Sequence, residues 1–151
     1  MRKASEKDIG RINEICKDGI FQEWTIQHSG KDEKKIKEDA ENDFNFHKKT
    51  IKKNLKDKKQ YWIVLEEKEG IIGVGSAYLK GKDKGIVESI YVAKAFQGKG
   101  YGKIILENLI SWIKSKKVKH VESNVLIRNE PSIKLHEKFG FEPYILRRRL
   151  R

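Results

Sequence analysis

The segment from residue 86 to residue 106 constrains the fold more than any other part of the chain. It opens with a β-branched and aromatic run, IVESIYV, which is typical of a buried strand. It continues through QGKGYG into a pattern of apolar residues at helical spacing. A strand, a glycine-rich turn and a helix in this order gather several free backbone N–H groups at one helix N-terminus. Because such a terminus attracts anions, we expect a pyrophosphate-binding turn here.

Glycine spacing separates the kinds of nucleotide-binding turn that this segment could form. A P-loop requires Ser or Thr after its Gly-Lys pair, but Ile104 follows Gly102 and Lys103. A dinucleotide fingerprint starting at Gly98 would need its third glycine at position 103, where the chain has lysine. Both readings therefore fail, and the remaining pattern is Q-x-x-G-x-G over residues 97–102.

Two motifs resemble the signatures of the GNAT superfamily of N-acetyltransferases. The first is Q-x-x-G-x-G, which resembles the acetyl-CoA signature of that superfamily. The second is NEPSIKLHEKFGF at residues 129–141, with an Asn, a small residue three positions later and a closing Gly-Phe. Both occur in the expected order, separated by one helix and one strand. The resemblance implies an acetyl-CoA-dependent N-acetyltransferase.

We expect a single domain over residues 1–151, an α/β fold with a mixed sheet in the order β-α-α-β-β-β-α-β-α-β, as in GNAT proteins. Ser5 and Asp8 form a capping pattern for the first helix, and Asp18-Gly19 is expected to end it. Glycines 73 and 75 inside a strand indicate a bulge or the close approach of a ligand. The expected elements are a strand stub at 1–4, an irregular segment at 20–30, helices at 31–56 and 129–139, and strands at 61–65, 71–79, 86–92, 120–126 and 141–146. A further helix is expected to follow the turn at 97–102 and to last to about residue 117.

The resemblance implies which residues bind acetyl-CoA. The backbone of Ile90, Tyr91 and Val92 would pair with the pantetheine arm. Asn129 and Ser132 would contact the cofactor from the other side. The residues around its diphosphate would be Gln97, Gly98, Lys99, Gly100, Tyr101, Gly102 and Lys103. For the two lysines, simple solvation in a lysine-rich protein is the alternative.

Glu88 is the expected general base, because it is the carboxylate on the central strand, where the superfamily often places its base. A solvent-facing role is the alternative, and Glu122 on the next strand is the reserve candidate. His136 stands where most GNAT proteins carry tyrosine, and the LHE version resembles phosphinothricin-type amino-acid acetyltransferases. We expect His136 to protonate the departing thiolate or to relay a proton through water, unless it merely packs under the cofactor.

No covalent or metal-assisted route is indicated. Cys16 lies on the apolar stripe of the first helix, so we expect a buried thiol and direct transfer within a ternary complex. No group of His, Cys and Asp has metal-ligand spacing, so we expect no metal.

The acceptor is expected to be a small-molecule amine or amino-acid-like compound, with polyamines and protein N-termini or lysines as alternatives. Trp24, Thr25 and His47 are candidate residues of the acceptor cleft, with Phe46 beside them; an ordinary core position is the alternative for His47. A net charge of +12 disfavours a polycationic acceptor unless the cleft is acidic. Asp39, Glu41 and Asp43 form the obvious acidic cluster that could reverse this.

Composition bounds the remaining possibilities. The excess positive charge is spread along the chain, and only residues 147–151 form a basic block, which argues against nucleic acid as the main partner. A non-catalytic acyl-CoA-binding or nucleic-acid-binding module remains the rival function. No apolar run approaches a membrane span, the first residues form no signal-peptide core, and the single cysteine fits a reducing compartment. We therefore expect a cytoplasmic protein without membrane contact, whose last strand could pair across a homodimer.

Overall fold

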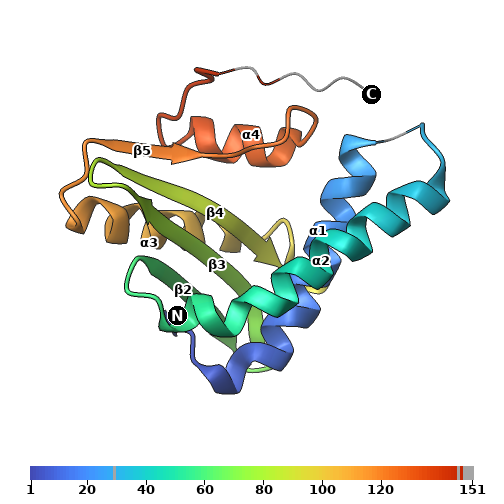
Figure 1. Ribbon diagram of the computed structural model, residues 1–151, viewed down its shortest axis with the longest axis horizontal. Helices are drawn as coiled ribbons and strands as arrows, with labels where there is room; N and C mark the ends of the chain where they lie inside the picture. The colour runs from blue at the N-terminus through green and yellow to red at the C-terminus, as the bar shows by residue number, and fades with distance from the viewer. Residues whose placement is uncertain (29, 146, 148–151) are drawn as a thin grey trace.

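The computed structural model describes residues 1–28, 30–145 and 147, and its strands form one five-stranded sheet (Figure 1). Strand order follows the chain, and all pairings are antiparallel except the parallel pairing of β4 with β5. This confirms the predicted mixed sheet. The strands are β1 (Arg2–Lys3), β2 (Gln60–Glu67), β3 (Gly70–Lys80), β4 (Lys84–Val92) and β5 (His120–Ser123).

Helices cover both faces of the sheet. The helices α1 and α2 lie together on one face, and α3 lies on the other, while α4 lies beside β5 (Figure 1). Two short 3₁₀ turns, η1 (Glu6–Asp8) and η2 (Lys94–Phe96), precede α1 and α3 respectively. The helices are α1 (Ile9–Gln27), α2 (Glu33–Lys56), α3 (Tyr101–Ser115) and α4 (Glu130–Glu137).

Two apolar clusters hold these layers together. The cluster between the sheet and α3 includes Ile105, Leu109 and Val87, and the cluster under α1 and α2 includes Cys16 and Trp62. Cys16 is fully buried, and burial raises the pKa of its thiol, which confirms the prediction of a buried thiol.

Glycines in the sheet make room for α3. A Cβ atom added at Gly73 would lie 2.9 Å from Ile105 Cδ1, and one added at Gly75 would overlap the same isoleucine. Helix packing therefore explains these two glycines. The sequence predicted a bulge or the close approach of a ligand at positions 73 and 75. A bulge does lie beside Gly73: Leu65 pairs with Gly73 and Glu66 with Ile71, which leaves Ile72 as an extra residue on β3.

The N-terminus is fixed by a buried carboxylate. Asp8, 6% exposed, accepts two hydrogen bonds of 2.8 Å from the Arg2 guanidinium and one of 2.8 Å from Ser5 N. The Arg2 hydrogen bonds hold the pKa of Asp8 well below its usual range. This confirms the predicted pairing of Ser5 with Asp8 ahead of the first helix.

The first helix is longer than the sequence indicated. It does not end at Asp18-Gly19 but continues to Gln27, so the predicted irregular segment at 20–30 is wrong over most of its length. A tertiary contact explains why position 19 is glycine: a Cβ atom there would overlap the ring of Tyr91 on β4. Glycine lets α1 approach the central strand at this point.

The described residues at the C-terminus form no strand, so the predicted strand at 141–146 is wrong for residues 141–145; position 146 lies outside the described residues. Phe141 is held by α4 instead, because its N–H donates to the His136 carbonyl at 3.2 Å and its ring packs edge-on against the His136 ring. Pro143 has no N–H to donate to a strand ladder. The strand predicted at 120–126 likewise ends early, at Ser123.

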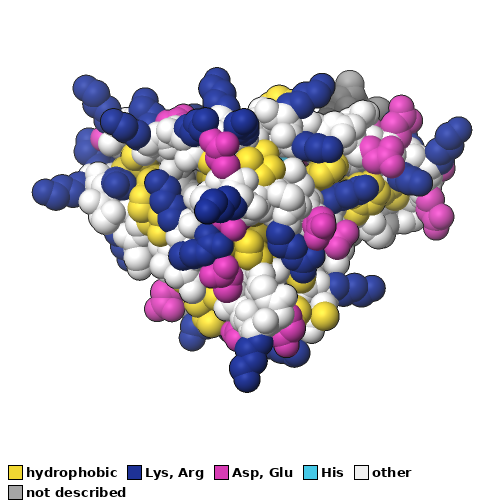
Figure 2. Space-filling view, turned by 90° about the horizontal axis from the view of Figure 1, so that it is seen from below, with side chains coloured by type: hydrophobic (Ala, Val, Ile, Leu, Met, Phe, Trp, Pro, Cys, Tyr) yellow, Lys and Arg dark blue, Asp and Glu magenta, His cyan; other side chains and the backbone are white. Residues whose placement is uncertain are grey.

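No helix in the described part of the chain is long and apolar enough to cross a bilayer. Lysine and arginine side chains are scattered over the face shown in Figure 2, with acidic side chains between them. On that face the excess positive charge forms no single block.

The Gly19 contact predicts opposite effects for two glycine substitutions in α1. Gly19→Ala should destabilise the protein by about 2 kcal/mol, because the new methyl group overlaps the Tyr91 ring. Gly10→Ala should instead stabilise it by up to about 1 kcal/mol, since no atom lies within 4 Å of the added Cβ and alanine is the better helix former. Urea unfolding monitored by circular dichroism measures both. Equal shifts for the two variants would contradict the close approach of α1 to β4.

Candidate active site

The glycine-rich turn at residues 97–102 connects η2 to α3. Gly98 and Gly100 have φ of 75° and 87°, a left-handed conformation that favours glycine, and Gly100 is the N-cap residue of α3. The Gln97 side-chain amide donates to the Val92 carbonyl at 2.9 Å and to Gln22 Oε1 at 3.1 Å. The turn is thereby fixed both to the end of β4 and to α1.

The turn carries backbone N–H donors that have no acceptor among the described residues. The backbone N–H groups of residues 98–102 form no hydrogen bond to any described part of the chain. Lys99 and Lys103 are exposed beside them, and Lys99 Nζ lies 5.4 Å from the centre of the Phe96 ring. Free N–H groups, a positive helix terminus and two cations together favour an anion such as a diphosphate.

Beside the turn, β4 parts from β5. The two strands pair only from Lys84 to Val87 on β4, so the β5-facing edge of residues 88–92 has no strand partner in the described chain (Figure 1). The side chains of Ile90 and Val92 pack into the cluster under α3, whereas Tyr91 points towards α1. The backbone of the three residues predicted to meet the pantetheine arm is therefore open along one edge.

Glu88 occupies a β-bulge at the point where the strands part. Ser76 pairs with Ser89 and Ala77 with Val87, which leaves Glu88 as the extra residue. Its Oε2 accepts a hydrogen bond of 3.4 Å from the hydroxyl of fully buried Ser76. Glu88 is exposed, as the solvent-facing alternative expected, yet partial desolvation by the surrounding protein raises the pKa of its carboxyl group. A carboxyl group with a raised pKa is suited to proton transfer near neutral pH.

The reserve candidate, Glu122, has the opposite electrostatic environment. It forms an ion pair of 2.6 Å with Lys84 and accepts a hydrogen bond of 3.1 Å from the Tyr144 hydroxyl. The hydrogen bond from Lys84 lowers the pKa of Glu122. Glu122 is therefore a poorer proton acceptor than Glu88.

His136 is 6% exposed, and both of its ring nitrogens are hydrogen-bonded within the protein. Nδ1 lies 2.7 Å from the carbonyl oxygen of Ser132, which can only accept, so Nδ1 carries the proton. Nε2 lies 2.8 Å from the Ser123 hydroxyl and accepts from it. Burial lowers the pKa of His136, so the ring is neutral at pH 7. This arrangement ties α4 to β5 and favours structural support over proton transfer.

The second motif packs against the first. Asn129 caps α4 by accepting a 3.3 Å hydrogen bond from Ser132 N, so its Oδ1 is engaged in the helix cap. The Leu135 side chain reaches Gly102, where an added Cβ would lie 3.5 Å from it. The structure thus brings α4 to the first turn of α3, as the resemblance implied.

The candidate acceptor residues divide into two groups. Trp24 Nε1 donates to Asp43 Oδ2 at 3.1 Å, and the half-buried His47 ring lies 5.6 Å from the Trp62 ring. Burial lowers the pKa of His47. Thr25 and Phe46, in contrast, are exposed, and the Thr25 hydroxyl donates to the carbonyl of Phe21 in its own helix.

Sequence reasoning missed Glu23. Its Oε2 accepts a hydrogen bond of 3.0 Å from the Tyr91 hydroxyl, and burial raises the pKa of its carboxyl group. Glu23 lies one helical turn after Gly19 on the same face of α1. A helix extended through position 19 would have drawn attention to it.

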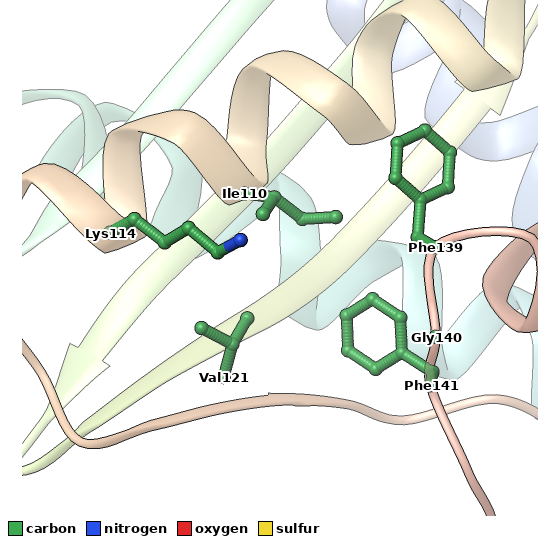
Figure 3. Close-up of a pocket in the computed structure, with 6 residues that line it drawn as sticks. All are labelled: Ile110, Lys114, Val121, Phe139, Gly140 and Phe141. Atoms are coloured by element: carbon green, nitrogen blue, oxygen red, sulfur yellow. The ribbon is translucent and has the colours of Figure 1, made fainter.

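A separate pocket of about 160 Å³ lies between α3, β5 and the turn after α4 (Figure 3). None of the predicted site residues is among its lining residues, Ile110, Lys114, Val121, Phe139, Gly140 and Phe141. Within the described residues, no group of three or more His, Cys, Asp and Glu side chains could hold a metal ion.

The sequence profile of the Acetyltransferase (GNAT) family matches residues 19–141. The chain belongs to this family. Membership indicates acyl-CoA-dependent acetyl transfer, and the match includes both motifs and the strand, turn and helix that form the site.

Solved structures of GNAT enzymes share the fold. Aminoglycoside 6'-N-acetyltransferase AAC(6')-IG from Acinetobacter haemolyticus is 15% identical, with a TM-score of 0.70, covering 99% of this chain and 95% of that one. The PaiA N-acetyltransferase of Thermoplasma acidophilum, in complex with coenzyme A, is 17% identical, with a TM-score of 0.76 and coverages of 93% and 87%. Ribosomal-protein-alanine N-acetyltransferase from Brucella melitensis is 24% identical, with a TM-score of 0.65 and coverages of 93% and 83%.

The hydrogen bonds of His136 predict a stability effect for its replacement in this GNAT protein. His136→Phe should lower the free energy of unfolding by about 2 kcal/mol, since it leaves the Ser123 hydroxyl without its partner. His120→Phe, at an exposed position on β5, should change stability by less than about 0.5 kcal/mol. Urea denaturation measures both. An unchanged midpoint for His136→Phe would show that the ring does not hold α4 to β5.

Proposed function

We propose that this protein is an N-acetyltransferase that transfers the acetyl group of acetyl-CoA to a primary amine of a small molecule. The observation that carries the proposal is a juxtaposition on one strand. The open edge of β4 begins at a carboxylate with a raised pKa and ends at a turn with free N–H groups. Amine acetylation needs a base, a place for the pantetheine arm and a site for the diphosphate. The carboxylate, the open edge and the turn would supply these three in order along the chain.

The residues present fit acetyl-CoA. A Cβ atom added at Gly98 or Gly100 would have no neighbour within 4 Å, so space is open along the turn for a diphosphate. The turn N–H groups would bind that diphosphate, with Lys99 and Lys103 nearby. The backbone of Ile90, Tyr91 and Val92 would hydrogen-bond to the amides of the pantetheine arm, as an added strand does. Acetyl-CoA supplies the acetyl group as an activated thioester.

Glu88 is the residue that we assign to proton removal. An alkyl ammonium group titrates near pH ~10, so it must lose a proton before its nitrogen can attack a carbonyl carbon. Desolvation has already made the Glu88 carboxylate a stronger proton acceptor, and the Ser76 hydroxyl orients it. Transfer is direct, because the Cys16 thiol is buried and its pKa is raised rather than lowered.

His136 receives a supporting role in this proposal. With Nδ1 donating to Ser132 and Nε2 accepting from Ser123, neither nitrogen is free to protonate a thiolate. Its place is to hold α4 against β5 and so to position Asn129 and Ser132. Water or the released ammonium proton can serve the thiolate instead.

A binding experiment tests the cofactor half of the proposal. Calorimetric titration should show micromolar affinity for acetyl-CoA and CoA and no comparable affinity for ATP or NADH. Gly100→Glu should abolish CoA binding, because it places a carboxylate at the free N–H groups of the turn. Gly81→Glu, at another left-handed glycine in the β3–β4 turn, introduces the same strain elsewhere and should leave binding intact. Absence of CoA binding in the folded wild-type protein would overturn the proposal.

A kinetic experiment tests the base. Glu88→Gln should lower kcat by about a hundredfold while CoA affinity stays unchanged. In the wild type, kcat should fall as the pH drops through the raised pKa of Glu88, because only the deprotonated carboxylate accepts a proton; the variant should lose this limb. Glu122→Gln should keep kcat within about twofold. The assignment is wrong if Glu122→Gln has the larger effect.

A further inference from the structure

The open edge of β4 ends at an acceptor that the protein itself already occupies. Ala93 N–H donates to the Ile72 carbonyl on β3 at 2.8 Å. The Val92–Ala93 peptide is trans, so the Val92 carbonyl points the opposite way, to the side of the open edge. The Gln97 side-chain amide donates to that carbonyl at 2.9 Å. Gln97 therefore closes the end of the edge, although it follows the strand in the chain.

The same amide group also reaches α1. Gln97 Nε2 lies 3.1 Å from Gln22 Oε1, on the helix that packs against β4. A carbonyl oxygen can only accept, so the NH₂ end of the Gln97 amide must be the end that faces the Val92 carbonyl. Its two N–H groups are then used by the Val92 carbonyl and by Gln22. Gln22 thus completes the hydrogen bonding of the group that joins the turn to the strand.

The near end of the glycine-rich turn depends on this side chain. Gly98 and Gly100 are residues with wide backbone freedom, and no backbone N–H of residues 98–102 donates within the described chain. The far end is held by α3, whose apolar face packs on the sheet. At the near end, a backbone hydrogen bond of 3.3 Å from Gln97 N to the Lys94 carbonyl is long. The Gln97 amide adds the two shorter contacts.

A turn that is held before the ligand arrives binds that ligand more tightly. The free N–H groups can meet one anion only when the backbone around them has a single conformation. If the turn were loose, binding would have to order it, and the lost conformational entropy would weaken affinity. The contact with α1 removes part of that cost in advance.

We infer that Gln22 is a positioning residue for the cofactor: acting through Gln97, it holds the glycine-rich turn in the form that binds the diphosphate of acetyl-CoA. This inference rests on the proposed acetyltransferase function and concerns the diphosphate end of the cofactor. The pantetheine end, along the edge of β4, should not depend on Gln22.

The experiment measures binding of two ligands to the whole chain. CoA carries the diphosphate, whereas pantetheine ends before it, so only CoA contacts the turn. Gln22→Met keeps the length of the side chain but removes the oxygen that accepts from Gln97. Calorimetry should show CoA binding weakened about fivefold, the effect of one hydrogen bond. Pantetheine affinity, followed through NMR shifts of the β4 amides, should stay unchanged. Gln22→Ala also removes the oxygen and should give the same loss.

A double-mutant cycle tests whether Gln22 acts through Gln97. Gln97→Met should weaken CoA binding more than Gln22→Met, because it also loses the Val92 contact. In the Gln97→Met background, Gln22→Met should cause no further loss, whereas independent residues would give additive losses. Gln27→Met is the matched control on the same helix, at a side chain whose Oε1 has no hydrogen-bond partner among the described residues. It should leave CoA affinity unchanged.

The outcomes separate this inference from the function on which it rests. Unchanged CoA affinity in Gln22→Met, or additive losses in the cycle, would overturn the role of Gln22 and leave acetyl transfer standing. An equal loss of affinity for CoA and pantetheine would do the same, because it would show a general disturbance of β4. Failure of the folded wild-type protein to bind CoA would overturn both.

Discussion

The parting of β4 from β5 after Val87 is the feature on which the rest of the site depends. A continuous parallel pairing would consume the backbone hydrogen bonds of residues 88–92 in the sheet, and no edge would remain for a pantetheine arm. The extra residue at position 88 interrupts the ladder on the β3 side of the strand at the same point. Because the bulge coincides with the fork, the carboxylate of Glu88 lies where the open edge begins. The glycine-rich turn then follows at the other end of that edge, so one strand sets the spacing between the two.

The second constraint is the close packing of α1 on this strand. Gly19 allows the Tyr91 ring to lie directly against the helix, and one turn later Glu23 meets the Tyr91 hydroxyl. A third contact joins Gln22 of the same helix to Gln97 in the turn. Helix α1 is therefore fixed to β4 and to the glycine-rich turn at separate points. Any movement of α1 would therefore disturb both the Tyr91 side of β4 and the glycine-rich turn.

The sequence predicted what is local and failed where contacts are distant. The strand, turn and helix at residues 86–106 and the helix beginning near Asn129 follow from periodicity, glycine and capping, so they were predictable. Gly19 was misread as a helix end. The reason for glycine at that position is contact with the Tyr91 ring, which lies 72 positions further along the chain. The bulge at Glu88 depends on register with β3, which no local pattern encodes. A strand was predicted from Phe141 onward, but His136 and α4 hold that phenylalanine instead.

Two glutamates on neighbouring strands show how surroundings decide chemistry within this fold. Lys84 lowers the pKa of Glu122, while desolvation raises the pKa of Glu88 and of Glu23. A carboxyl group whose pKa is raised by folding binds its proton more tightly in the folded state than in the unfolded state. Its contribution therefore favours folding at low pH and is lost as the pH rises through the raised pKa, so at neutral pH Glu23 and Glu88 reduce stability. No ion pair among the described residues involves either carboxylate, so no lysine or arginine offsets this cost, although the chain carries 34 of them.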